Sequence, residues 1–159
     1  MSNVQAVDAT MIDNLLAQAQ ASPRQRKNLN FHDRETHPCQ RLLNAILPGS
    51  YVRPHRHLLD NKEEFMIVVK GCLGVILYDA QGVVTGKMKL EENGPVRAIS
   101  IPTGVYHTAV ALAPTVIFEA KGGPYAPHRP DEMAAFAPAE GSTEAEDYLR
   151  KMEALLADA

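Results

Sequence analysis

Tryptophan is absent from the sequence, cysteine occurs only twice, and no apolar run approaches the length of a membrane span. A helix that crosses a membrane needs about 20 predominantly apolar residues, and the stretch after Met1, SNVQAVDAT, lacks the basic and apolar regions of a signal peptide. Cys39 and Cys72 have no close-spaced partner, so neither a disulfide framework nor a cysteine-based zinc site is indicated. We therefore expect a soluble, cytoplasmic protein with free thiols.

Basic residues are scarce as well. Lysine and arginine together number 16 against 19 aspartates and glutamates, which gives a formal net charge of −3. Proteins that bind nucleic acid or anionic lipid usually carry clustered basic residues, so neither partner is expected. The local cluster of Arg24, Arg26 and Lys27 in SPRQRK is interpreted as a solvated loop. A small molecule held in a pocket is the partner that this composition favours.

The length of 159 residues suits a single domain, because domains commonly hold about 100 to 200 residues. Helical spacing of apolar residues marks the two ends of the chain, and short apolar runs fill the middle. We expect an N-terminal helix in residues 1–23, a β-barrel in 40–121, a wrapping loop in 122–141 and a C-terminal helix in 142–159.

Both terminal segments carry signals for a helix start. Asp8 or Thr10 is available as the N-cap of the first helix. Thr143 and Glu146 predict a capping box at the start of the last helix. Each helix has an apolar stripe, so each needs a surface to cover.

Between the helices, short β-branched and aromatic runs alternate with turn residues. These runs predict eight strands, at residues 41–47, 50–57, 64–70, 72–78, 83–90, 96–101, 105–112 and 115–120. Regularly spaced strands without intervening helices are typical of an all-β sandwich or barrel. The number fits a jelly roll, in which two sheets pair around one core.

The segment GSYVRPHRHLLDNKEEFMIVVKG contains a pair of histidines and a pair of glutamates. Side chains alternate faces along an extended strand, so His55 and His57 point the same way, together with Arg53. Two imidazoles on one face stand close enough to share a cation. Glu63 and Glu64 precede an apolar strand, and at least one of them is carried toward the interior, where a bound cation would offset the cost of a buried carboxylate. The register decides which of the two it is.

A third histidine follows a turn later in the chain. In IPTGVYHT, Pro102 and Gly104 form a turn that delivers His107 to the start of a new strand. Three histidines and one glutamate would leave coordination positions open, which is expected of a reactive metal and not of a closed structural one.

These residues resemble the two motifs of the cupin superfamily. The first motif is matched by Gly49, His55, His57, Glu64 and Gly71, and the second by Pro102, Gly104 and His107. The spacing from the glutamate to the last glycine of the first motif favours Glu64 over Glu63. The resemblance implies a mainly β cupin-type double-stranded β-helix, a jelly-roll barrel with N- and C-terminal α-helices, that binds a divalent transition metal through His55, His57, Glu64 and His107. It leaves zinc, iron, nickel and manganese open.

More narrowly, QRLLNAILPGSYVRPHRH, IPTGVYHT, FEAKGGPY and APAEG resemble the WbuC-type cupin-fold metalloproteins, which are found beside bacterial O-antigen and other surface-polysaccharide genes. This likeness covers nearly the whole chain. It implies a role in polysaccharide biosynthesis, a sugar or sugar nucleotide as ligand, and a homodimer.

Several polar residues are weaker candidates for substrate binding. They are Arg53, Asn30, His32, Tyr106, Glu119 and Lys121. Arg53 would need an anionic partner, either a substrate group or Glu119. Glu119 and Lys121 alternate with apolar neighbours, so they face the cavity together or water together. His128, in the proline-rich loop, is expected to be exposed.

Three functions remain open from the sequence. The leading hypothesis is a metal-dependent isomerase or epimerase that acts on a small carbohydrate-derived molecule. A metal-dependent dioxygenase is the second, because open positions on such a site also bind dioxygen. A non-catalytic, metal-containing sugar-binding module is the third. No catalytic residue is assigned.

Overall fold

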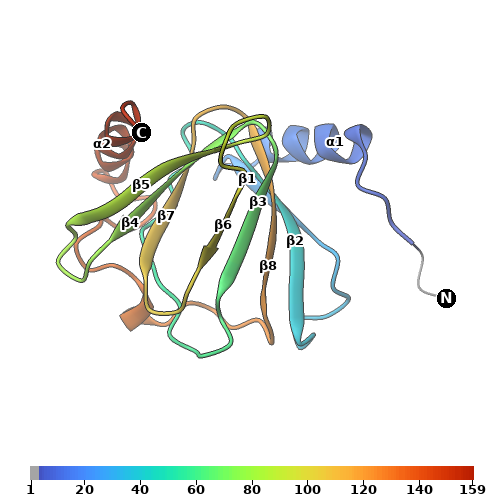
Figure 1. Ribbon diagram of the computed structural model, residues 1–159, viewed down its shortest axis with the longest axis horizontal. Helices are drawn as coiled ribbons and strands as arrows, with labels where there is room; N and C mark the ends of the chain where they lie inside the picture. Colours follow the sequence, from blue (N-terminus) through green and yellow to red (C-terminus); the bar gives the residue numbers. More distant parts are fainter. Residues whose placement is uncertain (1–3) are drawn as a thin grey trace.

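Two antiparallel sheets face each other across the apolar core of the computed structural model, which describes residues 4–159 (Figure 1). One sheet has the strand order β1-β2-β8-β3-β6 and the other the order β5-β4-β7. The strands are β1 (Arg26–Asn30), β2 (Cys39–Ile46), β3 (Glu64–Lys70), β4 (Cys72–Tyr78), β5 (Val84–Glu91), β6 (Ala98–Ile101), β7 (Tyr106–Ala111) and β8 (Thr115–Gly122). This is the predicted cupin-type double-stranded β-helix, and the fold prediction is confirmed.

Helices lie at both ends of the chain, as predicted. They are α1 (Ala9–Gln20) and α2 (Ala145–Leu156), and a short 3-10 turn, Pro130–Glu132, lies between β8 and α2. The first three residues of the segment predicted to hold the first helix lie outside the described residues. No described helix has both the length and the apolar character that a membrane span requires.

The core between the sheets follows from the alternation along the strands. In β3, Met66 and Val68 are buried while Phe65 and Ile67 face outward. Inward apolar side chains of both sheets, such as Leu73 of β4, pack against them. An alternating strand with one buried face fixes its register, because a shift by one residue would expose the whole apolar set.

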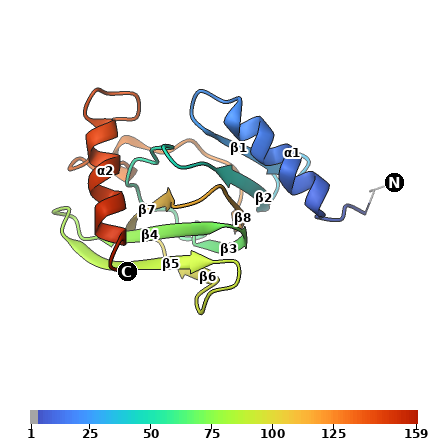
Figure 2. The same cartoon turned by 90° about the horizontal axis from the view of Figure 1, so that it is seen from above.

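The two helices cover the outer faces of different sheets (Figure 2). In α1, Leu15 and Ala19 pack against Leu43 of β2 and Val116 of β8. Asp8 caps this helix by accepting a hydrogen bond from the Met11 amide at 2.8 Å, so the first of the two predicted N-caps is confirmed.

On the opposite side, α2 packs on β4 and β7 through its buried side chains Leu149, Met152 and Leu156. The predicted capping box of Thr143 and Glu146 is wrong. The box requires Thr143 as the N-cap, but the helix begins one residue later, so the N-cap is Glu144. Its side chain makes no capping hydrogen bond. Glu146 instead forms an ion pair with Arg150 at 3.2 Å.

The strand prediction differs from the structure at two places. Residues 50–57 form no ladder, and the bridges found in this segment are isolated ones from His55 to His107 of β7 and to Met133 of the loop before α2. The cluster interpreted as a solvated loop ends in the first two residues of β1, Arg26 and Lys27, and Arg26 pairs with Ile46 of β2. Lysine and asparagine have low strand propensity, so this edge strand owes its conformation to pairing with β2.

An ion-pair cluster joins the start of β1 to the wrapping loop. Arg24 donates two hydrogen bonds to the Glu140 carboxylate at 2.7 and 2.8 Å, and Arg26 donates one at 2.7 Å. Burial alone would raise the pKa of Glu140, but the two guanidiniums hold it below its ordinary value. The ionised carboxylate therefore stabilises the fold near neutral pH.

Replacing Glu140 by glutamine should lower the free energy of unfolding by roughly 0.5 to 1 kcal/mol at neutral pH, since a partly exposed pair is screened by solvent. The folded-state pKa is depressed, so this stabilisation is present above the ordinary glutamate pKa and is lost as the pH falls through the folded value. Urea unfolding of both proteins across acidic pH measures the difference. Glu146→Gln, at an exposed pair on α2, is the matched control and should change stability less; an equal effect of the two would contradict the prediction.

Candidate metal centre

Three histidines and one glutamate from distant parts of the chain meet at one end of the barrel. His55 and His57 come from the extended segment before β3, Glu64 begins β3, and His107 lies in β7. One ligand atom of each side chain lies within 4.8 Å of those of the other three. The structure thus brings together all four residues that the sequence predicted as metal ligands.

Backbone hydrogen bonds hold the histidine segments against each other. The His55 amide donates to the His107 carbonyl at 3.0 Å, and the His107 amide donates back at 2.8 Å. The Gly104 amide donates to the His57 carbonyl at 2.8 Å. Gly104 has a φ of +85°, a left-handed conformation that glycine adopts without the steric cost of a side chain, and this shapes the turn before β7.

The imidazole rings are oriented by carbonyl groups of the same segments. Nδ1 of His55 lies 3.0 Å from the Arg53 carbonyl oxygen, and Nδ1 of His107 lies 2.9 Å from the Val105 carbonyl oxygen. A carbonyl can only accept, so Nδ1 carries a proton and Nε2 is the nitrogen turned toward the cluster. Burial, followed by the neighbouring His107, lowers the pKa of His55 to about 3, so this ring is neutral near pH 7.

Glu64 is the acid of the cluster and is only 5% exposed, whereas Glu63 faces solvent. Its Oε1 lies 2.8 Å from Nε2 of His57, and its Oε2 lies 3.0 Å from Nε2 of His107. Burial would raise the pKa of Glu64, but hydrogen bonds from the two histidines and the charge of Lys121 hold it well below its usual range. The sequence left open which of Glu63 and Glu64 points inward, and in the structure it is Glu64.

This donor set fits a divalent transition metal. Imidazole nitrogens and carboxylate oxygens bind such ions at about 2.0 to 2.2 Å, so ligands on opposite sides of one ion lie roughly 4 Å apart. The observed separations, none above 4.8 Å, need only small side-chain movements to reach that spacing. Four protein donors would also leave room for ligand oxygens on a five- or six-coordinate ion.

Two charged side chains of β8 adjoin the cluster. Lys121 donates to Glu64 Oε1 at 3.0 Å and to Glu119 Oε1 at 2.8 Å. Burial lowers the pKa of Lys121, but the two carboxylates outweigh it and keep the ammonium charged. Burial and the Glu64 charge raise the pKa of Glu119. Glu119 and Lys121 thus face the interior together, which is one of the two arrangements that the sequence allowed.

His128 lies beside the cluster, a contact that the sequence did not predict. Its ring centroid is 4.5 Å from that of His55 and 5.0 Å from that of His57. The residue is exposed, as expected, but it borders the site from the wrapping loop. No spacing signal predicts this contact, because the loop between β8 and α2 has no periodic pattern.

The remaining predicted binding residues divide into two groups. Asn30, His32, Glu119 and Lys121 line one cavity of about 640 Å³. Arg53 and Tyr106 are not among its described lining residues.

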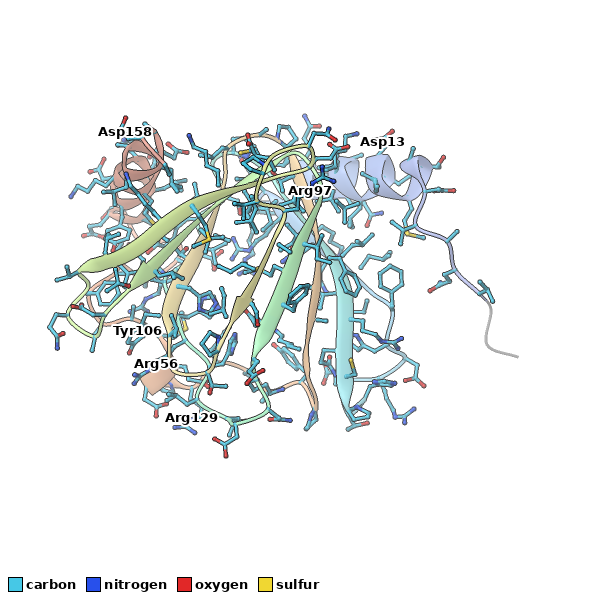
Figure 3. All side chains as sticks on the ribbon, in the orientation of Figure 1. Asp13, Arg56, Arg97, Tyr106, Arg129 and Asp158 are labelled. Carbon is cyan, nitrogen blue, oxygen red and sulfur yellow. The ribbon has the colours of Figure 1, made fainter. Side chains whose placement is uncertain are left out.

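The two outlying residues have partners within the protein. The Arg53 guanidinium, expected on the face of the histidines, donates to the Ala134 carbonyl at 2.7 Å. The Arg56 guanidinium lies over the ring of Tyr106, with its Cζ atom 4.5 Å from the ring centroid. Both residues lie at the end of the barrel where Arg129 also lies (Figure 3). Their predicted binding roles stay predictions.

A family model described as "Domain of unknown function (DUF6016)" matches residues 7–90 of the chain. This range includes three of the four clustered residues, His55, His57 and Glu64, and ends before the turn that carries His107. No curated protein matches the chain in sequence.

Solved structures resemble the chain in fold. A salicylate 1,2-dioxygenase from Pseudaminobacter salicylatoxidans superposes with a TM-score of 0.57 at 11% identity, over 74% of this chain and 34% of that one. A conserved protein of unknown function, SPY1581 from Streptococcus pyogenes, superposes with a TM-score of 0.53 at 12% identity. The match covers 78% of this chain and 91% of that one. An oxalate oxidase in complex with glycolate superposes with a TM-score of 0.52 at 16% identity. The match covers 66% of this chain and 54% of that one. At these identities the likeness shows the fold alone.

Proposed function

The chain belongs to the family described as a domain of unknown function, DUF6016, and we propose that it is a metal-dependent enzyme that acts on a small carbohydrate-derived molecule. The observation that carries the proposal is the convergence of three imidazoles and one carboxylate within 4.8 Å. Buried charges and imidazoles gathered in this way are costly unless a cation is shared among them.

His55, His57, Glu64 and His107 would hold a divalent ion such as zinc, iron, nickel or manganese. When bound, such an ion supplies Lewis-acid chemistry and lowers the pKa of a coordinated hydroxyl or carbonyl group. The Nδ1 contacts of His55 and His107 with backbone carbonyls fix their rings with Nε2 toward the centre.

Lys121 and Glu119 supply the charged groups nearest to the centre. The Lys121 ammonium orients Glu64 through its contact with Oε1 and offers positive charge to an acidic substituent of a substrate. Glu119, held by Lys121 at 2.8 Å, presents a buried carboxyl group that can take or return a proton at its free oxygen. This pair suits an isomerisation or epimerisation, in which a proton moves between two carbon atoms or between carbon and oxygen.

The resemblance to WbuC-type proteins supports the finer part of the proposal. It favours a substrate from surface-polysaccharide metabolism, such as a sugar or sugar nucleotide, and a homodimeric protein. These assignments rest on the quoted motifs and not on a contact in the structure.

Metal analysis combined with turnover assays tests the proposal. The purified protein should contain about one transition-metal ion per chain and should convert a sugar acid or sugar nucleotide without consuming oxygen. Oxygen consumption coupled to substrate loss would favour the dioxygenase instead. Ligand-induced thermal stabilisation of the metal-loaded protein without any conversion would favour the binding module. Protein that takes up no transition metal would contradict all three.

A further inference from the structure

The cavity of about 640 Å³ extends away from the candidate metal centre along the inner face of β8, β2 and β1. Glu119, Lys121 and His128, which adjoin the centre, also line this cavity. A smaller hollow lined by His57 shares Lys121, Tyr125 and His128 with this cavity, so the cavity adjoins the centre, and the part over β1 and β2 has no role in holding the ion.

Strand register shows how the chemistry of this face changes across the sheet. Asn28 of β1 lies opposite Asn44 of β2, and Gln40 of β2 lies opposite Lys121 of β8, which in turn lies opposite Glu64. In β3 the next inward residues are apolar, as described above for the core. The same sheet face thus passes from apolar inside the barrel to amide-rich on β1 and β2.

The polar wall is built into the fold and does not consist only of surface side chains. Gln40 is 3% exposed, and its amide donates to the Glu35 and His37 carbonyls at 3.1 and 2.9 Å. Glu119 is 7% exposed and fixed by Lys121. Asn28 donates to Asn30 at 2.8 Å, which shows that their side chains lie on one face and leaves each amide a further donor.

Amide side chains match hydroxyl groups, because both offer a donor and an acceptor. Four amides line the cavity. Asn28, Asn30 and Asn44 offer both donors and acceptors, whereas Gln40, whose two N–H groups are held by backbone carbonyls, offers only its oxygen. Leu42 is the apolar side chain among the lining residues of β1 and β2, so an aromatic ring would find little apolar surface there.

The cations of the cavity are largely paired. Arg24 and Arg26 hold Glu140, and Lys121 holds Glu64 and Glu119. Lys27 is the fourth lysine or arginine among the lining residues. A diphosphate, which binds through several unpaired cations, is therefore a poor match for this wall.

The length of the wall exceeds one sugar ring. Three inter-strand steps separate β3, which carries Glu64, from β1, and each step is about 4.8 Å, so the site spans about 14 Å. We propose that the amide wall of β1 and β2 is a subsite for the second sugar unit of a glycan with at least two linked rings, whose first unit lies at the metal centre. This inference rests on the proposed function and narrows its substrate class.

Calorimetric titration of the metal-loaded protein with maltose, cellobiose and lactose, against glucose, galactose and UDP-glucose, tests the subsite. At least one disaccharide should bind about tenfold more tightly than its component monosaccharides, the gain expected from one or two further hydrogen bonds. The double variant Asn28→Ala and Asn44→Ala should abolish this difference while its metal content and monosaccharide affinity stay unchanged. Asn14→Ala, at an exposed position on α1, is the matched control and should retain the difference.

Each other result has a defined meaning. Equal affinity for disaccharides and monosaccharides, no disaccharide binding, or tightest binding of UDP-glucose would overturn the subsite while full metal content still supported the proposed function. Disaccharide binding that is lost in the double variant, in a protein that takes up no metal, would support the subsite and contradict the proposed function.

Discussion

Replacement of His57 by alanine is expected to lower the affinity for a divalent transition metal by at least about 100-fold and to abolish turnover. The change removes one of four clustered donors and leaves Glu64 Oε1 without its contact at 2.8 Å. The backbone hydrogen bonds between His55 and His107 fix their two segments, so neither segment can supply a donor at the position that His57 leaves. Elemental analysis of the purified variant, and titration of the metal-free protein with zinc, measure the loss.

His37→Ala is the matched control for this variant. Nδ1 of His37 lies 3.1 Å from the Cys39 amide, and His37 is not one of the clustered residues, so this variant should keep its metal. Circular dichroism and thermal unfolding must show that both variants fold. A folded His57→Ala protein with full metal occupancy would remove His57 from the ligand set.

Replacement of Leu156 by alanine is expected to lower the free energy of unfolding by about 2 to 5 kcal/mol. Leu156 is fully buried between α2 and β4, and its side chain occupies the space beside Gly74. A Cβ atom built on Gly74 would lie 2.2 Å from Leu156 Cδ1, so the absence of a side chain on this strand allows the close approach. Truncation of the leucine leaves a cavity that backbone atoms cannot readily fill.

The adjacent residue provides the control for this second variant. Leu155 is 39% exposed on the same helix, and Leu155→Ala should change stability by less than about 0.5 kcal/mol. Urea denaturation at neutral pH measures both. A similar loss for the two variants would show that α2 contributes through helix propensity and not through the packing of its buried face.

The fold was predictable wherever one strand face is buried. The alternation of Met66 and Val68 with outward neighbours marks β3, whereas β4 is marked by a continuous apolar run because α2 also covers its outer face. The edge strand β1 was not predictable from local residues, because its amide-rich inner face meets the cavity and not the core. The sequence around Pro54 predicts a strand, but the segment is extended and forms no ladder. Proline has no backbone N–H to donate to a neighbouring strand.

The cluster itself was predictable because its spacing is local within two short segments. His55 and His57 lie two residues apart, and His107 follows a turn whose glycine has a positive φ. The contact of His128 was not predictable, because it depends on the path of an aperiodic loop. The partner of Arg53 was not predictable either, since its guanidinium donates to the Ala134 carbonyl of the wrapping loop and not to Glu119.

The contact between His107 and Glu64 bears on how the protein would acquire its ion. Both ring nitrogens of His107 make polar contacts, Nδ1 with the Val105 carbonyl at 2.9 Å and Nε2 with Glu64 Oε2 at 3.0 Å, and a hydrogen bond between Nε2 and the carboxylate requires one proton between them. A cation bound at Nε2 would take the place of this proton, which would be released to solvent. Metal binding at this site would thus exchange a proton for the metal ion. Low pH would oppose metal binding, and the enthalpy measured for binding would include the protonation of the buffer.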